Sequence, residues 1–238
     1  MLQHLKRKQK QLQEMKSDFY TSRGTHVYFK DDLINDEIDI EQIIAKVEGA
    51  LPEHLLSELE MVVIGWFDEF EERQLSAFYK DGILHISNQR NEEAGMYKDI
   101  VHEISHSVEE AYGYQIYGDQ NIKEEFLRKR KILHDKLWAL GYKAPLKWFM
   151  ETEYDKEFDQ FLLEKVGPEK MRMICMGLFI NAYAPTSLRE YFATGFADFY
   201  LHSNHNYLKK LSPALYEKLL LIQNPKKLDN DQTTGYNI

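Results

Sequence analysis

The pattern of apolar and polar residues along the chain predicts a small β-sheet in the N-terminal part and helices after it. Short apolar runs predict strands at residues 25–29 and 61–67, and apolar residues at helical spacing predict a helix over about 39–50. A hairpin is predicted at residues 75–87, where an Asp-Gly turn separates two short apolar segments. The run at 61–67 is uninterrupted, so we expect that strand to be covered on both faces.

Beyond residue 96 the apolar residues recur every three or four positions, which predicts a mainly helical C-terminal half. Helices are predicted at residues 97–113, 121–140, 146–166, 169–181 and 188–201. The first of them is expected to end at its Tyr112-Gly113 pair, which is a common helix C-terminal signal. Together these elements predict an α+β fold in which a small mixed sheet packs on the helix at 97–113.

The helix predicted at residues 97–113 carries the sequence His102-Glu103-Ile104-Ser105-His106, an H-E-x-x-H motif. Residues four apart lie on one face of a helix, so His102 and His106 can present two imidazoles to one metal ion. Glu103 lies beside them, placed to take a proton from a water that the metal activates. The alternative interpretation is an exposed amphipathic helix with two solvated histidines. The opposite face of the helix is apolar and consists of Tyr97, Ile100, Val101, Ile104, Val108 and Ala111.

A catalytic zinc site with two histidines needs a third protein ligand and keeps its fourth position open. Glu190 is the best candidate, because it lies near the start of the helix at 188–201, opposite the apolar residues of that helix. Ser187 stands three residues earlier, so the pair also fits a capping box, in which Glu190 only stabilises the helix start. The segment alone is equally compatible with both roles, and the H-E-x-x-H motif elsewhere in the chain favours ligation.

Composition and charge narrow the classes of function. The chain has 238 residues, 43% of them hydrophobic and 29% charged, as in an ordinary globular protein, and no apolar run is long enough to cross a bilayer. The net charge of −9 argues against general nucleic-acid binding. The single cysteine, Cys175, has no partner for an internal disulfide and is expected to be a buried thiol. A metal site therefore has to consist of histidines and carboxylates.

A family resemblance rests on the H-E-x-x-H motif together with the sequence Tyr-Ala-Pro-Thr-Ser-Leu-Arg-Glu-Tyr-Phe-Ala at residues 183–193. The two segments resemble the catalytic domain of anthrax lethal factor and the related Pro-Pro endopeptidases, and more distantly Mlc titration factor A. The resemblance covers residues 25–113 loosely and 181–222 more closely. It implies a zincin-like fold of the gluzincin type and the activity of a zinc metallopeptidase.

The resemblance also implies roles for individual residues. The zinc-dependent endopeptidase would use Glu103 as the general base for the water that attacks the peptide bond. Tyr183 corresponds to a tyrosine that assists the oxyanion in this family. Thr194 stands where lethal factor has a further glutamate, one turn after the third ligand. The single catalytic Zn²⁺ would be held by three residues: His102, His106 and Glu190.

The chain is expected to form one zincin-like domain over residues 1–238, with residues 114–168 as a helical insertion between the motif helix and the helix of the third ligand. We expect the insertion to pack beside the active site and to restrict substrates to flexible peptide segments. The alternative is a helical hairpin that only enlarges the core. Substrates with basic residues near the cleaved bond would be favoured by the acidic stretch at residues 68–72 together with acidic residues of the insertion: Glu151, Glu153, Asp155 and Glu157.

Two other classes of function fit the same sequence. One is a regulatory protein-binding module on a zincin scaffold, with weak or incidental peptidase activity. The other is a metal-free helical protein with a chance H-E-x-x-H. We expect a peptide or protein substrate as partner, no nucleic acid and a monomer. The first twenty residues carry no secretory signal peptide, which predicts a cytoplasmic protein if the chain is complete and a secreted one if a signal peptide has been removed.

Overall fold

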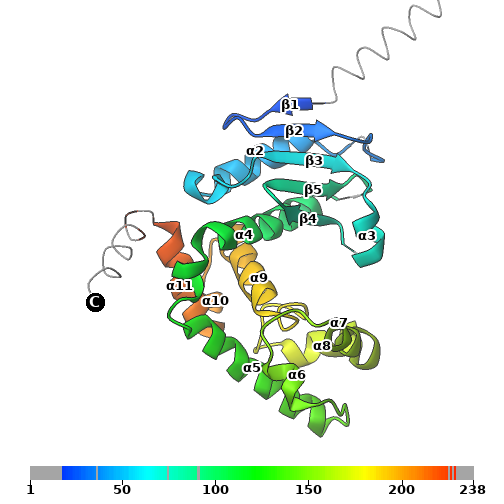
Figure 1. Ribbon diagram of the computed structural model, residues 1–238, viewed down its shortest axis with the longest axis vertical. Coiled ribbons are helices and arrows are strands. Elements are labelled where there is room, and N and C mark those ends of the chain that lie inside the picture. Colours follow the sequence, from blue (N-terminus) through cyan, green and yellow to red (C-terminus); the bar gives the residue numbers. More distant parts are fainter. Residues whose placement is uncertain are drawn as a thin grey trace, which may run out of the picture. The chain divides into compact units, whose positions relative to one another are not determined.

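The computed structural model describes residues 18–224 except 36, 74, 90 and 91, together with residues 226 and 228. The chain divides into two compact units, residues 1–107 and 108–238, and each is described by itself. The first contains a β-sheet and the second is helical (Figure 1). The division falls within one helix, α4 (Glu93–Tyr117), which therefore contributes to both units. No helix in the described part of the chain is both long enough and apolar enough to cross a membrane.

The described residues of the first unit form a mixed sheet of five strands in the order β1-β2-β3-β5-β4. β2, β3 and β5 run parallel to one another, while β1 and β4 are antiparallel to their neighbours. The α+β fold and the small mixed sheet expected from the sequence are confirmed. The strands are β1 (Asp18–Tyr20), β2 (His26–Phe29), β3 (Met61–Gly65), β4 (Ala77–Lys80) and β5 (Ile83–Ser87).

The predicted hairpin is confirmed as the antiparallel pair β4 and β5. Asp81 (φ 49°) and Gly82 (φ 81°) both have positive φ values, as a tight two-residue hairpin turn requires. The prediction for β3 is only partly right. Its Val62 and Ile64 are fully buried, whereas Val63 on the opposite face is only half-buried. Side chains alternate between the faces of a strand, so one face of β3 is completely covered and the other is not.

The predicted helix at 39–50 is confirmed as α2 (Ile40–Ala50), and the short 3-10 helix η1 (Glu53–Leu56) follows it. The Asp39 side chain accepts a hydrogen bond from the backbone of Gln42 and so caps the first turn of α2. The backbone N–H of Asp39 donates to the Glu93 side chain at the start of α4 (3.1 Å). The Lys46 ammonium lies 4.3 Å from the centre of the Tyr97 ring on α4. Two polar contacts therefore connect α2 with α4.

Helix α4 is longer than the sequence predicts. It begins at Glu93 and continues through a kink at Tyr112 (φ −121°, ψ 20°) to Tyr117. The predicted end at Tyr112-Gly113 coincides with this kink, where the backbone of Tyr112 is not helical. A further helical stretch follows it, in which Gln115 and Ile116 are buried. The apolar face expected from the spacing is buried at Ile100, Val101, Ile104 and Val108, but Ala111 at its end is exposed.

The described part of the first unit also contains α3 (Asp68–Arg73), which follows β3. The second unit consists of α5 (Asn121–Ala139), α6 (Leu146–Met150), α7 (Lys156–Gln160), the π-helical η2 (Phe161–Val166), α8 (Pro168–Cys175), α9 (Leu188–Leu201), α10 (Asn206–Leu211) and α11 (Pro213–Gln223).

Two helix predictions in the second unit need correction. The helix predicted at 146–166 is interrupted between α6 and α7, because the backbone O of Thr152 bonds to Leu188 and the Asp155 side chain caps α7. The helix predicted at 169–181 ends at Cys175, and Gly177 shortly after it takes a positive φ of 71°. The helix predicted at 188–201 is confirmed with the same bounds as α9.

The core of the second unit lies where α9 meets α5 and α11. The contact between α9 and α11 is close at Gly195, where an added Cβ would lie 3.0 Å from the Leu215 Cγ and closer still to one of its methyl groups. The most buried aromatic side chains of this unit include Phe126, Phe149, Phe158, Phe179, Tyr191, Phe192 and Phe196.

Candidate metal centre

The two motif histidines lie on the polar face of α4. Burial of Ile100, Val101 and Ile104 on the opposite face fixes how the helix is turned about its axis. The rings of His102 and His106 are half-buried, with centroids 5.5 Å apart and planes nearly perpendicular. The motif thus presents two neighbouring imidazoles on one face, as the i, i+4 spacing predicts.

Glu190 lies in the first turn of α9. The Ser187 hydroxyl oxygen accepts a hydrogen bond from the backbone N–H of Glu190 (3.1 Å), so Ser187 is the N-cap of this helix. The sequence left open whether Glu190 serves the cap or a metal ion. The Ser187 half of the capping box is present, and the Glu190 carboxylate lies in one group with the two histidines.

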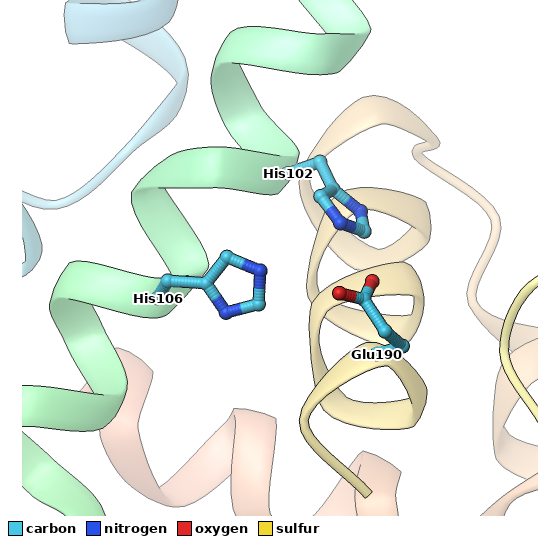
Figure 2. A group of neighbouring side chains, drawn as sticks. All are labelled: His102, His106 and Glu190. Carbon is cyan, nitrogen blue, oxygen red and sulfur yellow. The ribbon is translucent and has the colours of Figure 1, made fainter. Parts of the chain in front are cut away.

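His102, His106 and Glu190 form a group that could hold a metal ion. Each offers one ligand atom, and these atoms all lie within 4.8 Å of one another. Figure 2 shows both imidazole rings and the carboxylate directed toward a common space from α4 and α9. Metal bonds to imidazole nitrogen and carboxylate oxygen are about 2.0–2.2 Å long, so two atoms bound to one ion lie at most about 4.4 Å apart, close to the separation found here. The donor set therefore fits a single metal ion.

Glu103 occupies the flank of the same helix and contacts the sheet. Its Oε2 accepts a hydrogen bond from the backbone N–H of Tyr79 in β4 (3.2 Å). The Ser87 N–H donates to the Ser76 carbonyl, so alternation along the antiparallel pair directs the backbone groups of Ala77 and Tyr79 away from β5. Because β4 is an edge strand, the Glu103 carboxylate lies at the outer edge of the sheet.

A second acidic residue of α4, Glu109, is tied to α9. Its side chain is only 6% exposed, and its Oε2 accepts from the Arg189 guanidinium (3.2 Å) while its Oε1 accepts from the Tyr117 hydroxyl. Burial and the neighbouring carboxylate both raise the pKa of the Tyr117 phenol, which therefore stays protonated as a donor. Burial lowers the pKa of Arg189, but the neighbouring Glu109, Tyr117 and Glu190 together raise it by more, so the guanidinium stays charged.

A buried polar network holds α9 against α5 and α11. The Tyr191 hydroxyl donates to Glu125 Oε1 (2.8 Å) and accepts from the Lys129 ammonium (2.8 Å). Lys129 also donates to the Ser212 hydroxyl (2.7 Å), and the Glu125 carboxylate accepts from backbone amides at the start of α11. Burial lowers the pKa of Lys129 to about 8, although Glu125 opposes this. Tyr191 follows Glu190, so this network restrains the helix that carries the carboxylate.

The segment between α6 and α7 lies against the start of α9. The Leu188 N–H donates to the Thr152 carbonyl (2.8 Å), two residues before Glu190. Burial raises the pKa of Asp159, the Glu190 charge raises it further, and a hydrogen bond from Tyr154 (3.0 Å) acts in the opposite direction. This part of residues 114–168 is therefore close to Glu190.

Tyr183 lies in the loop before α9. The Asn181 side chain accepts hydrogen bonds from the backbone N–H groups of Tyr183 (2.9 Å) and Ala184 (2.8 Å), which fix the start of this loop. The Tyr183 side chain is 40% exposed and lines an open pocket of about 460 Å³ together with Phe179 and Tyr207. Its catalytic role stays a prediction.

Three further residues differ in burial: Thr194, Cys175 and Glu110. Thr194 is buried, and its hydroxyl donates to the Tyr191 carbonyl within α9 (3.2 Å). Cys175 is a buried thiol, as expected, and burial raises its pKa to about 12. Glu110, the acid four residues after His106, is exposed.

Sequence reasoning missed three residues around the site: Tyr79, Glu109 and Arg189. For Glu109 a signal exists, because His102, His106 and Glu109 follow an i, i+4, i+7 spacing that places all three on one helix face. Arg189 and Tyr79 carry no such signal, since their partners are distant in the chain.

Comparison of the chain with protein-family models, with curated proteins and with solved structures finds no match in any of the three.

Proposed function

We propose that the protein is a zinc-dependent endopeptidase of the gluzincin type, with a zincin-like fold. The observation that carries the proposal is the gathering of His102, His106 and Glu190 with their ligand atoms within 4.8 Å of one another. The resemblance of the H-E-x-x-H motif and of residues 183–193 to lethal factor and the Pro-Pro endopeptidases supports the same conclusion.

Two imidazoles and one carboxylate are a donor set typical of catalytic zinc, which keeps a fourth position open for water or substrate. When bound, zinc would lower the pKa of a water molecule at the site to about 7 and would polarise the scissile carbonyl. His102, His106 and Glu190 would hold the ion. The half-burial of all three side chains leaves the group accessible to a substrate.

Glu103 would act as the general base. Its carboxylate would take a proton from the attacking water and then pass that proton to the leaving amine. The hydrogen bond from Tyr79 N–H to Oε2 holds the carboxylate in one orientation, which favours proton transfer at a defined position.

The outer edge of β4 would align the substrate. An extended peptide can add to an edge strand through main-chain hydrogen bonds, and the outward N–H and C=O of Ala77 and the outward C=O of Tyr79 have the direction that this needs. Because Tyr79 contacts Glu103, a peptide held along β4 would pass close to the general base. Tyr183 would donate a hydrogen bond to the carbonyl oxygen as negative charge develops on it.

The proposal is tested by zinc content and peptide hydrolysis of the same preparations. Protein purified without added metal should contain one zinc ion per chain and should cleave members of a peptide library. His106→Ala and Glu190→Ala should lose both zinc and hydrolysis, because each removes one of three ligands. Ser187→Ala is the matched control for α9, since it removes the cap and keeps all three ligands. Full zinc affinity in Glu190→Ala would contradict the proposal and leave Glu190 with the capping role.

A further inference from the structure

Glu109 is a buried acidic residue of α4 that lies close to the proposed metal ligands. It is a carboxylate with a side chain only 6% exposed, and both of its oxygens have partners, Tyr117 at one and Arg189 at the other. Burying a carboxylate is unfavourable unless charged and hydrogen-bonding groups compensate it. The half-exposed Arg189 and the Tyr117 hydroxyl supply that compensation here.

The ion pair between Glu109 and Arg189 lies next to the proposed metal ligands on both α4 and α9. Glu109 follows His106 by three residues on the same face of α4, about 4.5 Å further along the helix axis. Arg189 immediately precedes Glu190 in the first turn of α9. The ion pair therefore joins α4 to α9 one turn beyond the point where imidazoles and carboxylate converge.

We propose that Glu109, Arg189 and Tyr117 form a positioning clamp that holds the Glu190 carboxylate in register with the histidines of α4. Residues that orient metal ligands commonly lie one contact away from the ion, and their loss weakens metal binding by about 10- to 100-fold. Thr194, one turn after Glu190, instead bonds to the backbone of its own helix. The clamp supports Glu190 from its N-terminal side, through Arg189, and Thr194 follows Glu190 on the C-terminal side. This inference rests on the proposed function.

Three variants separate the contributions of the clamp. Glu109→Gln keeps the shape and one hydrogen-bond acceptor but removes the charge that Arg189 pairs with. Arg189→Gln removes the cation from a side chain that is 55% exposed, so folding should tolerate it. Tyr117→Phe removes only the hydroxyl that bonds to Oε1. The matched control is Asp119→Asn, which breaks another ion pair of the same unit, that with Lys218 (2.8 Å).

The measurements are zinc affinity, by competition with a chromophoric chelator, and thermal unfolding of the metal-free protein. Glu109→Gln and Arg189→Gln should each weaken zinc binding by about 10- to 100-fold, and the double variant should be no weaker than the worse single one. Tyr117→Phe should have a smaller effect in the same direction. Asp119→Asn should change zinc affinity by less than about twofold.

The outcomes distinguish the clamp from the proposed function. A wild-type protein that binds no zinc overturns both. Wild-type zinc binding with unchanged affinity in Arg189→Gln and Glu109→Gln overturns the clamp alone. A lower unfolding temperature of the metal-free variants with unchanged zinc affinity shows a purely structural pair and also overturns the clamp. If Glu109→Gln does not fold, Arg189→Gln decides the question by the same criteria.

Discussion

At the scale of single residues, Glu103 combines two features that a general base needs. It follows His102 directly on α4, and its carboxylate is oriented by the backbone N–H of Tyr79. Glu110 lies on the same helix but is exposed. The chemical difference between these two glutamates therefore comes from their surroundings.

The first prediction follows from this difference. Glu103→Gln should keep zinc at wild-type stoichiometry and lower kcat by about 10²- to 10⁴-fold, because the amide cannot accept the proton of the attacking water. Zinc analysis and steady-state kinetics on a cleaved peptide measure both quantities. Glu110→Gln is the control and should leave kcat unchanged. Equal kcat values for Glu103→Gln and wild type would exclude Glu103 as the base.

Tyr183 gives the second prediction. Tyr183→Phe should lower kcat by about 10²- to 10³-fold with little change in KM, because the hydroxyl is needed mainly as charge develops on the carbonyl oxygen. Tyr207 lines the same pocket, so Tyr207→Phe is a matched control that removes a hydroxyl nearby. If the two variants have the same kcat, Tyr183 only packs in its loop.

At the scale of elements, α9 is held from three directions. Ser187 caps its first turn, the network around Tyr191 joins it to α5 and α11, and Gly195 lets α11 approach closely. The buried network is polar, and each of its charged groups has a charged or hydroxyl partner. The helix that carries Glu190 is therefore restrained along much of its length.

Gly195 provides a prediction on stability. Alanine favours a helix interior over glycine by about 1 kcal/mol, but at this position its methyl group would collide with the buried Leu215 side chain. Overpacking costs about 1–3 kcal/mol, so Gly195→Ala should lower the free energy of unfolding, as measured by urea denaturation. Gly49 in α2 has open space around an added Cβ, so Gly49→Ala should be neutral or stabilising. A stabilised Gly195→Ala would show that α11 can shift without cost.

At the scale of the whole molecule, the net charge of −9 makes the surface attractive to basic partners. Part of this negative charge lies in the segment between α6 and α7, residues 151–155. The hydrogen bond from the Leu188 N–H to the Thr152 carbonyl attaches this segment to the start of α9, two residues before Glu190. Residues 114–168 are thus anchored near the start of α9, as expected if they shape substrate choice.

Charge reversal in this segment tests its role in specificity. Glu151→Lys combined with Glu153→Lys should reduce the preference for substrates with basic residues near the cleaved bond and weaken the dependence of kcat/KM on salt. Cleavage profiles of a peptide library at low and high ionic strength measure both effects. Reversal at Glu164 and Glu169, which lie in η2 and α8, is the control. An unchanged profile would mean that the insertion only enlarges the core.

Local sequence signals determined several elements with near-correct bounds. The helical spacing of apolar residues predicted α2, the Asp-Gly turn predicted the β4–β5 hairpin, and the Ser187 cap predicted α9. The H-E-x-x-H spacing likewise predicted two imidazoles on one helix face. These features depend on contacts within a turn or two of the chain, so the residues that make them are neighbours in the sequence.

Only the tertiary structure decided those helix bounds and side-chain pairs that depend on residues distant in the sequence. α4 continues past Gly113 because Gln115 and Ile116 find buried positions, and the segment after α6 leaves the helix where Thr152 bonds to Leu188. Likewise, only folding brings Glu190 to the histidines and pairs Arg189 with Glu109, eighty residues away. Hydrophobic and polar periodicity records which face of a helix is buried, but not which other element covers it. The α+β class was therefore readable from the chain, whereas the packing that brings Glu190 to the histidines was decided by long-range contacts.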